Sequence, residues 1–233
     1  MTTEREPFEA VRERADDTRD ELERWNPNWE AELVVLAAIL LGLLLPDQLT
    51  IGSRWIVPAC EGALLLGLVV STPHRPSSED PKRRVVRIVL VAIVSAANVV
   101  ALFLLAQALL DTGKQDARAL LLGGGVLWLT AVLLFGVWFW ELDRGGPVRR
   151  KLGHDRDPDF IFPEMSDDAW APDKWLPRVS DYLYLSLTNA ASFSSPEDTV
   201  PVSGVAKLAL SVQTLASLVT MTIVLAYAIN NLN

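Results

Sequence analysis

The sequence predicts an all-α, polytopic membrane protein with five transmembrane helices and one short re-entrant or interfacial helix before the last span. Half of the 233 residues are hydrophobic, and the mean hydropathy is +0.25. The apolar residues are grouped, with uninterrupted uncharged runs of 23 residues at 88–110, 22 at 119–140 and 26 at 208–233. Each run exceeds the roughly 18 apolar residues that mark a membrane-spanning helix, which disfavours a soluble globular enzyme.

Residues 1–26 are expected to form an acidic, cytoplasmic, amphipathic segment. The first 30 residues contain ten acids and five arginines, the opposite of the basic region that begins a secretory signal. A stripe at spacings of three and four residues, typical of an amphipathic helix, consists of Phe8, Val11, Ala15, Thr18, Leu22 and Trp25. This helix either lies against the membrane domain or self-associates. The first is favoured, because so short a helix is marginal by itself.

Residues 27–142 are expected to form a four-helix transmembrane region. Asn26-Pro27 begins the first span, over 27–45, because asparagine caps helices and proline is tolerated in a first turn. The second span covers about 55–72, and the first two long uncharged runs supply the third and fourth. The second span carries a lone acid, Glu61.

An ionisable side chain such as Glu61 inside a membrane is costly, so it usually faces a partner or a wet cavity. Two interpretations stay open. Glu61 has a functional role, or it is structural and reaches the interface or pairs with Arg118 of the neighbouring loop.

Enzyme, cofactor and metal-site signatures are absent from the sequence, so no catalytic activity and no cofactor are expected. There is no HExxH, GxSxG or Walker motif, and the two histidines lie in separate loops. One cysteine provides neither a disulfide nor a zinc site, and a net charge of −8 disfavours nucleic acid as a partner. The glycines at 123–125 lie inside an apolar run and are interpreted as a place of close helix packing.

Residues 143–180 are expected to form a polar cytoplasmic loop, and 181–233 a short pore-like helix, a loop and the last transmembrane helix. The uncharged segment at 182–196 has 15 residues, too few to cross a bilayer core of about 30 Å. Lys and Arg number 17 on the side that holds the N-terminus and 3 on the other. This bias predicts a cell (inner) membrane protein with a cytoplasmic N-terminus.

Polar side chains concentrate around the short helix, for which Ser180-Asp181 is the expected cap and 182–190 the expected extent. Irregular backbone over 192–202 is tolerated at membrane depth only where it is buried or lines a water-filled path. Hydroxyl, amide and carboxylate oxygens there can replace the hydration shell of an ion. The candidate pore residues are Thr188, Asn189, Ser192, Ser194, Ser195, Glu197 and Asp198. Polar residues of the last span, which line a path or pack against helices, are Ser211, Gln213, Thr214, Ser217, Thr220 and Thr222.

Two resemblances follow from these residues. Thr188 at the end of a short helix, the segment Asp198-Thr199-Val200-Pro201 and the basic Lys207 resemble the pore region of tetrameric potassium-type cation channels over about 30 residues. Residues 189–197 stand where that family has a shorter Gly-Tyr-Gly run. The resemblance implies a homo-oligomer and monovalent cations as partners.

The second resemblance is to a bacterial family of multi-spanning inner-membrane proteins of unknown function, from about the fourth span to the C-terminus. It rests on Asp159-Phe160-Ile161-Phe162-Pro163, Asp181-Tyr182-x-Tyr184-x-Ser186, Ser195-x-x-Asp198, Gln213-x-x-x-Ser217 and Ala226-x-x-x-Asn230. It implies a fold and a location without an activity. The sequence therefore leaves two functions open: an oligomeric pore-loop cation channel with an unusual filter segment, or a non-conducting scaffold or accessory subunit embedded in membrane lipid.

Overall fold

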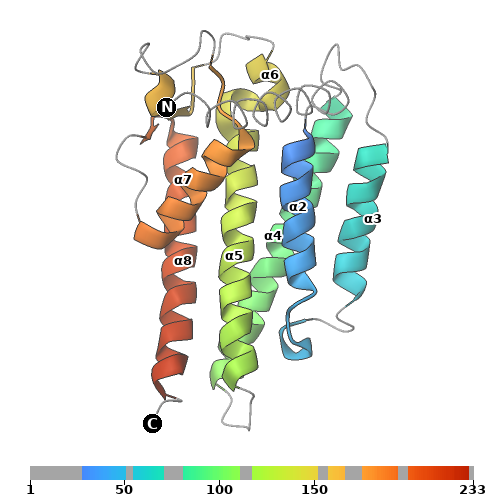
Figure 1. Cartoon of the computed structure of the whole chain (residues 1–233), viewed down its shortest axis with the longest axis vertical. Helices are drawn as coiled ribbons and strands as arrows, with labels where there is room; N and C mark the ends of the chain where they lie inside the picture. Colours follow the sequence, from blue (N-terminus) through green and yellow to red (C-terminus); the bar gives the residue numbers. More distant parts are fainter. Residues whose placement is uncertain are drawn as a thin grey trace, which may run out of the picture.

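The structure, a computed structural model, is a bundle of helices with one very small sheet (Figure 1). It describes residues 28–50, 55–70, 81–110, 117–151, 157–165, 175–193 and 199–230. The main helices are α2 (Trp29–Gly42), α3 (Ile56–Val70), α4 (Pro81–Leu110), α5 (Ala117–Leu142), α7 (Val179–Ser192) and α8 (Gly204–Asn230). The short elements are η1 (Asp47–Leu49), η2 (Asp143–Gly145), α6 (Pro147–Lys151), β1 (Phe160–Ile161), η3 (Pro163–Met165) and β2 (Val200–Pro201). The all-α prediction is confirmed, and the acidic segment 1–26 lies outside the described residues.

Three helices of the described chain are long and apolar enough to cross a membrane. They are α4 over 82–108, α5 together with η2 over 118–145, and α8 over 204–229. The two other predicted spans correspond to α2, with 14 residues, and α3, with 15. At 1.5 Å per residue these helices measure only about 21–23 Å. The structure therefore supports a membrane protein with three spans by length, and α2 and α3 are short apolar helices beside them.

Helix α5 is the centre of the bundle, because it contacts α2, α4, α7 and α8. Its side chains enter three buried clusters. Val137 packs with residues of α2, α3 and α4, Leu127 with residues of η1 and α4, and Phe139 with the start of α7 and with α8. In Figure 1, α7 and α8 lie on one side of α5 and α2 and α3 on the other.

Two of the three consecutive glycines at 123–125 of α5 are sites of close packing, as predicted. A Cβ added to Gly123 would lie 2.7 Å from Cδ1 of Leu49, and one added to Gly124 would collide with Val224 of α8. Gly125 has open space around it. The packing interpretation is confirmed for the first two positions.

The chain turns back on itself through α7. Figure 1 shows α7 beginning at the end of the bundle where α5 ends, crossing obliquely toward α8, and ending beside the upper half of α8. The following strand β2 pairs antiparallel with β1 at the end where α7 began, with Phe160 opposite Pro201. Helix α7 covers 179–192 where the sequence predicted 182–190, so it begins three residues earlier and ends two residues later than expected.

Candidate functional site

The start of α7 is fixed by a buried carboxylate, that of Asp143 at the end of α5. Its Oδ2 accepts a hydrogen bond of 2.5 Å from the Tyr182 hydroxyl, and its Oδ1 accepts backbone hydrogen bonds from Asp159 and Phe160 at 2.8 and 3.4 Å. The Arg150 guanidinium lies 3.8 Å from Oδ2. One carboxylate thus joins the end of α5, the first turn of α7, strand β1 and helix α6.

A glycine-rich turn places Asp143 and Arg150 together. Arg144, Gly145 and Gly146 all have positive φ, at 51°, 77° and 109°, a region where glycine is favoured. The turn reverses the chain after α5, so that Arg150 on α6 donates 2.8 and 2.9 Å hydrogen bonds to the carbonyls of Trp140 and Asp143. Arg150 therefore binds both the backbone and the carboxylate at the end of α5.

The ring of Tyr182 is enclosed by aromatic and cationic side chains. It packs edge-on against Phe160 and Phe162, with ring centroids 6.2 and 5.2 Å apart, and the Arg150 guanidinium lies 5.3 Å from its centre. Burial raises the pKa of the Tyr182 hydroxyl well above its usual range, so at neutral pH the group stays protonated and donates to Asp143. The first turn also has a local cap, because the Asp181 carboxylate accepts a 2.7 Å hydrogen bond from the backbone N–H of Arg178.

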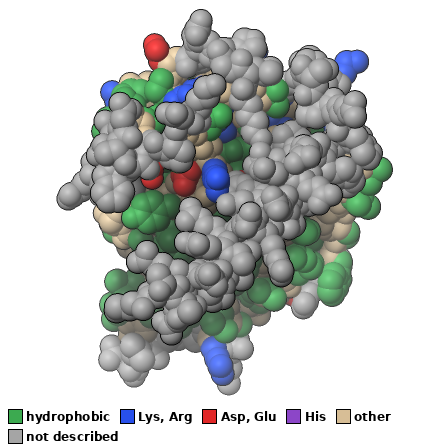
Figure 2. Space-filling view, turned by 45° about the horizontal axis from the view of Figure 1, so that its top comes forward, with side chains coloured by type: hydrophobic (Ala, Val, Ile, Leu, Met, Phe, Trp, Pro, Cys, Tyr) green, Lys and Arg blue, Asp and Glu red, His purple; other side chains and the backbone are tan. Residues whose placement is uncertain are grey.

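A buried ion pair lies beside this cluster. The Arg87 guanidinium of α4 binds the Glu141 carboxylate of α5, with a second contact of 3.3 Å, and also lies 5.7 Å from the Trp140 ring centre. Figure 2 turns this end of the bundle forward, and a few acidic and basic side chains are visible there next to hydrophobic ones. The charged end thus holds α4, α5, α6 and α7 together.

A second polar layer joins α7 to α8 deeper in the bundle. Gln213 donates to the carbonyl and the hydroxyl of Ser186 at 2.9 and 2.6 Å, and accepts a 2.9 Å hydrogen bond from Asn189. The Ser186 hydroxyl donates to the carbonyl of Val132 on α5 at 2.7 Å. These side chains are almost completely buried, so the layer fixes the angle at which α7 crosses α8.

Three of the seven candidate pore residues lie in α7. Asn189 is 2% exposed and belongs to the second polar layer, where it also donates to the carbonyl of Leu210. Thr188 is half-buried and donates to the carbonyls of Tyr184 and Leu185 within its own helix. Ser192 is exposed on the last turn. The other candidates lie outside the described residues: Ser194, Ser195, Glu197 and Asp198.

The polar residues of α8 fall into two groups. Gln213, Ser217 and Thr220 are buried on the stripe that faces the bundle. Thr214 donates a 3.3 Å hydrogen bond to Asn189, while the Ser211 hydroxyl is exposed and bonds within the helix. Thr222 is exposed as well. Most polar residues of this helix therefore support helix–helix packing in the single chain.

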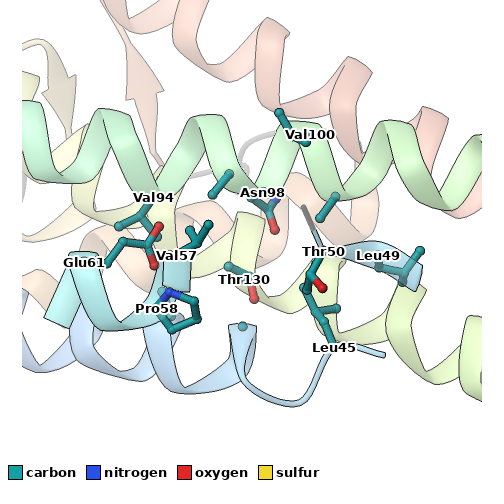
Figure 3. Close-up of a pocket in the computed structure, with 14 residues that line it drawn as sticks. Leu45, Leu49, Thr50, Val57, Pro58, Glu61, Val94, Asn98, Val100 and Thr130 are labelled. Carbon is teal, nitrogen blue, oxygen red and sulfur yellow. The ribbon is translucent and has the colours of Figure 1, made fainter. Parts of the chain in front are cut away.

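Glu61 lies on the other side of α5, buried at 4% exposure, and lines a cavity with residues of α2, α4 and α5 (Figure 3). Its Oε1 atom has no hydrogen-bond partner among the described residues. The cavity and the α7–α8 layer are separate places in the bundle.

The roles of Asp143, Arg150 and the Arg87–Glu141 pair were not foreseen from the sequence, which assigned 143–180 to a polar loop. A signal was present, because an acid followed by Arg-Gly-Gly-Pro directly after an apolar run indicates a sharp turn. Which distant side chains this turn brings to Asp143 depends on how α7 packs.

Comparisons with protein-family models, curated proteins and solved structures find no match to this chain. The described residues also contain no group of three or more His, Cys, Asp or Glu side chains that could hold a metal ion. The site must therefore be interpreted from its own geometry.

Proposed function

We propose that the protein is a multi-pass membrane protein of five spans whose α7–α8 hairpin forms, in a homo-oligomer, the pore module of a cation channel. The observation that carries the proposal is the course of the chain: α7 starts at one end of the bundle and stops part-way along α8, and the next described element, β2, lies back at the end where α7 began. Backbone that leaves a helix at membrane depth must be buried in protein or face water. A water-filled path beside the end of α7 meets this requirement.

The five spans are α2, α3, α4, α5 and α8. Helices α2 and α3 lie beside α4 and α5 in the bundle, and their outer faces carry exposed apolar side chains such as Leu33, Leu40, Leu64 and Leu66. Apolar side chains on these outer faces contact the acyl chains of membrane lipids. Flanking residues and local thinning of the bilayer compensate for helices shorter than its core.

The direction of α7 favours cations. A helix carries partial negative charge at its C-terminus, and α7 brings that end to the exposed flank of the bundle beside the upper half of α8, while the polar cluster around Asp143 holds its N-terminus at the charged end. The oxygens of the segment 194–198, predicted from the sequence, follow directly. A ring of Glu197 and Asp198 side chains from several copies would concentrate cations at the mouth.

Helix α8 supplies the surface for oligomerisation. Only 22% of its most apolar stretch is buried within the chain, against 50% for α5. Leu208, Leu215 and Leu218 of α8 and Leu187 of α7 are exposed on this flank. The flank can pack against a second copy through apolar contacts, as membrane helices do.

The competing function is a non-conducting scaffold or accessory subunit. It is favoured by the saturation of Asn189, since its amide nitrogen and oxygen both bind protein groups rather than facing a path. In that case α7 fills the space between α5 and α8 and stabilises the bundle.

Cation flux into liposomes containing the purified full-length protein distinguishes the two functions. The channel proposal expects flux from a symmetric oligomer, and expects Asp198→Asn to lower it several-fold because the mouth loses charge. Asp157→Asn, an exposed acid before β1, is the matched control and should leave flux unchanged. A monomer that passes no cations under any gradient would refute the channel and favour the scaffold.

Orientation has its own test. The bias of Lys and Arg places the charged end and the N-terminus in the cytoplasm, and five spans place the C-terminus outside. Reporter fusions at the two termini should therefore give opposite signals. A cytoplasmic signal from both would contradict the five-span topology.

A further inference from the structure

A cavity of about 130 Å³ lies among α2, η1, α3, α4 and α5, apart from the α7–α8 hairpin. Figure 3 shows Glu61, Asn98 and Thr130 around it, each contributed by a different helix: α3, α4 and α5. Its volume is similar to that of apolar protein cavities of about 150 Å³ that hold benzene, so it accommodates a group of about six non-hydrogen atoms.

Three residues that line this cavity each have a buried side-chain oxygen without a hydrogen-bond partner among the described residues. The atoms are Oε1 of Glu61, Oδ1 of Asn98 and Oγ1 of Thr130. Glu61 and Thr130 are 4% and 5% exposed. Buried polar atoms are nearly always hydrogen-bonded, and a single orphan calls for an explanation. Three acceptors from three helices at one cavity indicate a ligand that donates hydrogen bonds.

The arginines on the two helices that supply Asn98 and Thr130 lie too far along the bundle to be these donors. Arg118 precedes Thr130 by twelve residues on α5, about 18 Å of helix, and Arg87 precedes Asn98 by eleven residues on α4, about 16 Å. Arg87 is also bound to Glu141. The structural interpretation in which Glu61 pairs with Arg118 therefore finds no support in this arrangement.

The remaining lining narrows the chemistry of the ligand. It is almost entirely apolar, with Leu45, Leu49, Val57 and Val94 among its members. Thr50 also lines it, but its hydroxyl donates to the carbonyl of Asp47. Ca²⁺ and Mg²⁺ require about six or more oxygen ligands, more than this lining offers. Mostly apolar walls with a few convergent polar groups are typical of a site for a small organic molecule.

We propose that this cavity binds a primary ammonium group, with Glu61, Asn98 and Thr130 each accepting one of its three N–H donors. An ammonium ion donates three hydrogen bonds and accepts none, so it satisfies the three orphan oxygens and balances the buried carboxylate. The apolar walls contact the carbon chain. The group comes either from a free alkylamine or from the head group of an ethanolamine phospholipid, and the site does not depend on whether the α7–α8 hairpin conducts.

Calorimetric titration of the full-length protein in detergent tests the free amine. n-Propylammonium should bind, whereas tetramethylammonium, which has the charge but no N–H donor, should bind at least about 10-fold more weakly, since hydrogen bonds to charged groups are strong. Glu61→Gln, which keeps the shape but removes the charge, should weaken binding by about 10-fold or more, and Thr130→Val by several-fold. Thr220→Val is the matched control: Thr220 is equally buried, but its hydroxyl binds the carbonyl of Ala216. It should leave the affinity unchanged.

Nanodiscs of ethanolamine or choline phospholipid test the lipid source, with bound lipid counted by native mass spectrometry. If the parent protein retains ethanolamine lipid and Glu61→Gln abolishes that retention, the site is assigned to lipid. If the protein binds n-propylammonium but retains no ethanolamine lipid, the site is assigned to a free amine. Tetramethylammonium binding as tightly as n-propylammonium would overturn the proposal. So would a parent protein that elutes as a single folded species and binds neither n-propylammonium nor ethanolamine phospholipid. Binding of Na⁺ alone would overturn it too.

Discussion

The hydroxyl of Tyr182 provides the sharpest test of how α7 is held in place. Tyr182→Phe removes the donor of the 2.5 Å hydrogen bond to Asp143 and leaves the rest of the ring unchanged. Its edge contacts with Phe160 and Phe162 persist in the variant, as does its position beneath Arg150. Any loss of stability therefore reports the hydrogen bond rather than the packing.

The size of the effect follows from burial and charge. Tyr182 and Asp143 are both 0% exposed, so water cannot replace the lost donor. A hydrogen bond to a charged group contributes about 1.5–3 kcal/mol, and Asp143 keeps its backbone donors and Arg150. We expect the free energy of unfolding to fall by about 2 kcal/mol, roughly a 30-fold change in the folding equilibrium.

The assay is reversible unfolding in mixed micelles by titration with a denaturing detergent, followed by far-ultraviolet circular dichroism. Tyr184→Phe is the control, because Tyr184 lies two residues away on the same helix and is 62% exposed. Its variant should unfold like the parent protein. Equal and negligible effects of the two substitutions would refute the role of Asp143 as the anchor of α7.

Three further substitutions are tested by the same unfolding assay. Gln213→Leu removes three hydrogen bonds between α8 and α7 and should cost about 2 kcal/mol, at roughly 0.6 kcal/mol for each bond inside a membrane; an unchanged stability would contradict the second polar layer. Gly136→Ala places a Cβ 3.2 Å from the Leu183 backbone and should cost about 1–3 kcal/mol, whereas Gly125→Ala, with open space, should be neutral or stabilising by up to about 1 kcal/mol. Equal effects of the two would disprove the close approach of α5 and α7. Glu141→Gln removes the charge that faces a buried guanidinium and should cost about 3 kcal/mol, and a loss below 1 kcal/mol would show that the pair is not buried as described.

Much of the fold could be predicted from the sequence because long apolar runs allow few structures. The three spans that are long enough, the short helix before the last one and the packing role of Gly123 and Gly124 were all expected. The bounds of α7 were less accurate, since the helix extends from Val179, next to the Asp181 cap, to Ser192, where the left-handed backbone of Phe193 ends it.

The candidate site was predicted only in part. The sequence pointed to Asn189 and Glu61 as polar groups in apolar surroundings, and both are buried. It did not foresee that Asn189 would bind Gln213, or that Glu61 would share a cavity with Asn98 and Thr130. Hydropathy shows that a polar side chain has apolar neighbours in the sequence. It does not show which neighbouring helix or cavity that side chain faces.

By itself, the sequence determined that this chain belongs in a membrane and that one uncharged segment is too short to cross it. Both conclusions depend on length and local polarity, which are properties of contiguous residues. Only the tertiary structure decided that Asp143 anchors α7, that Asn189 and Gln213 lock it to α8, and that Glu61 faces a cavity with two other orphan acceptors. These contacts join residues far apart in the chain, and their partners are selected by the rotation and crossing angle of packed helices.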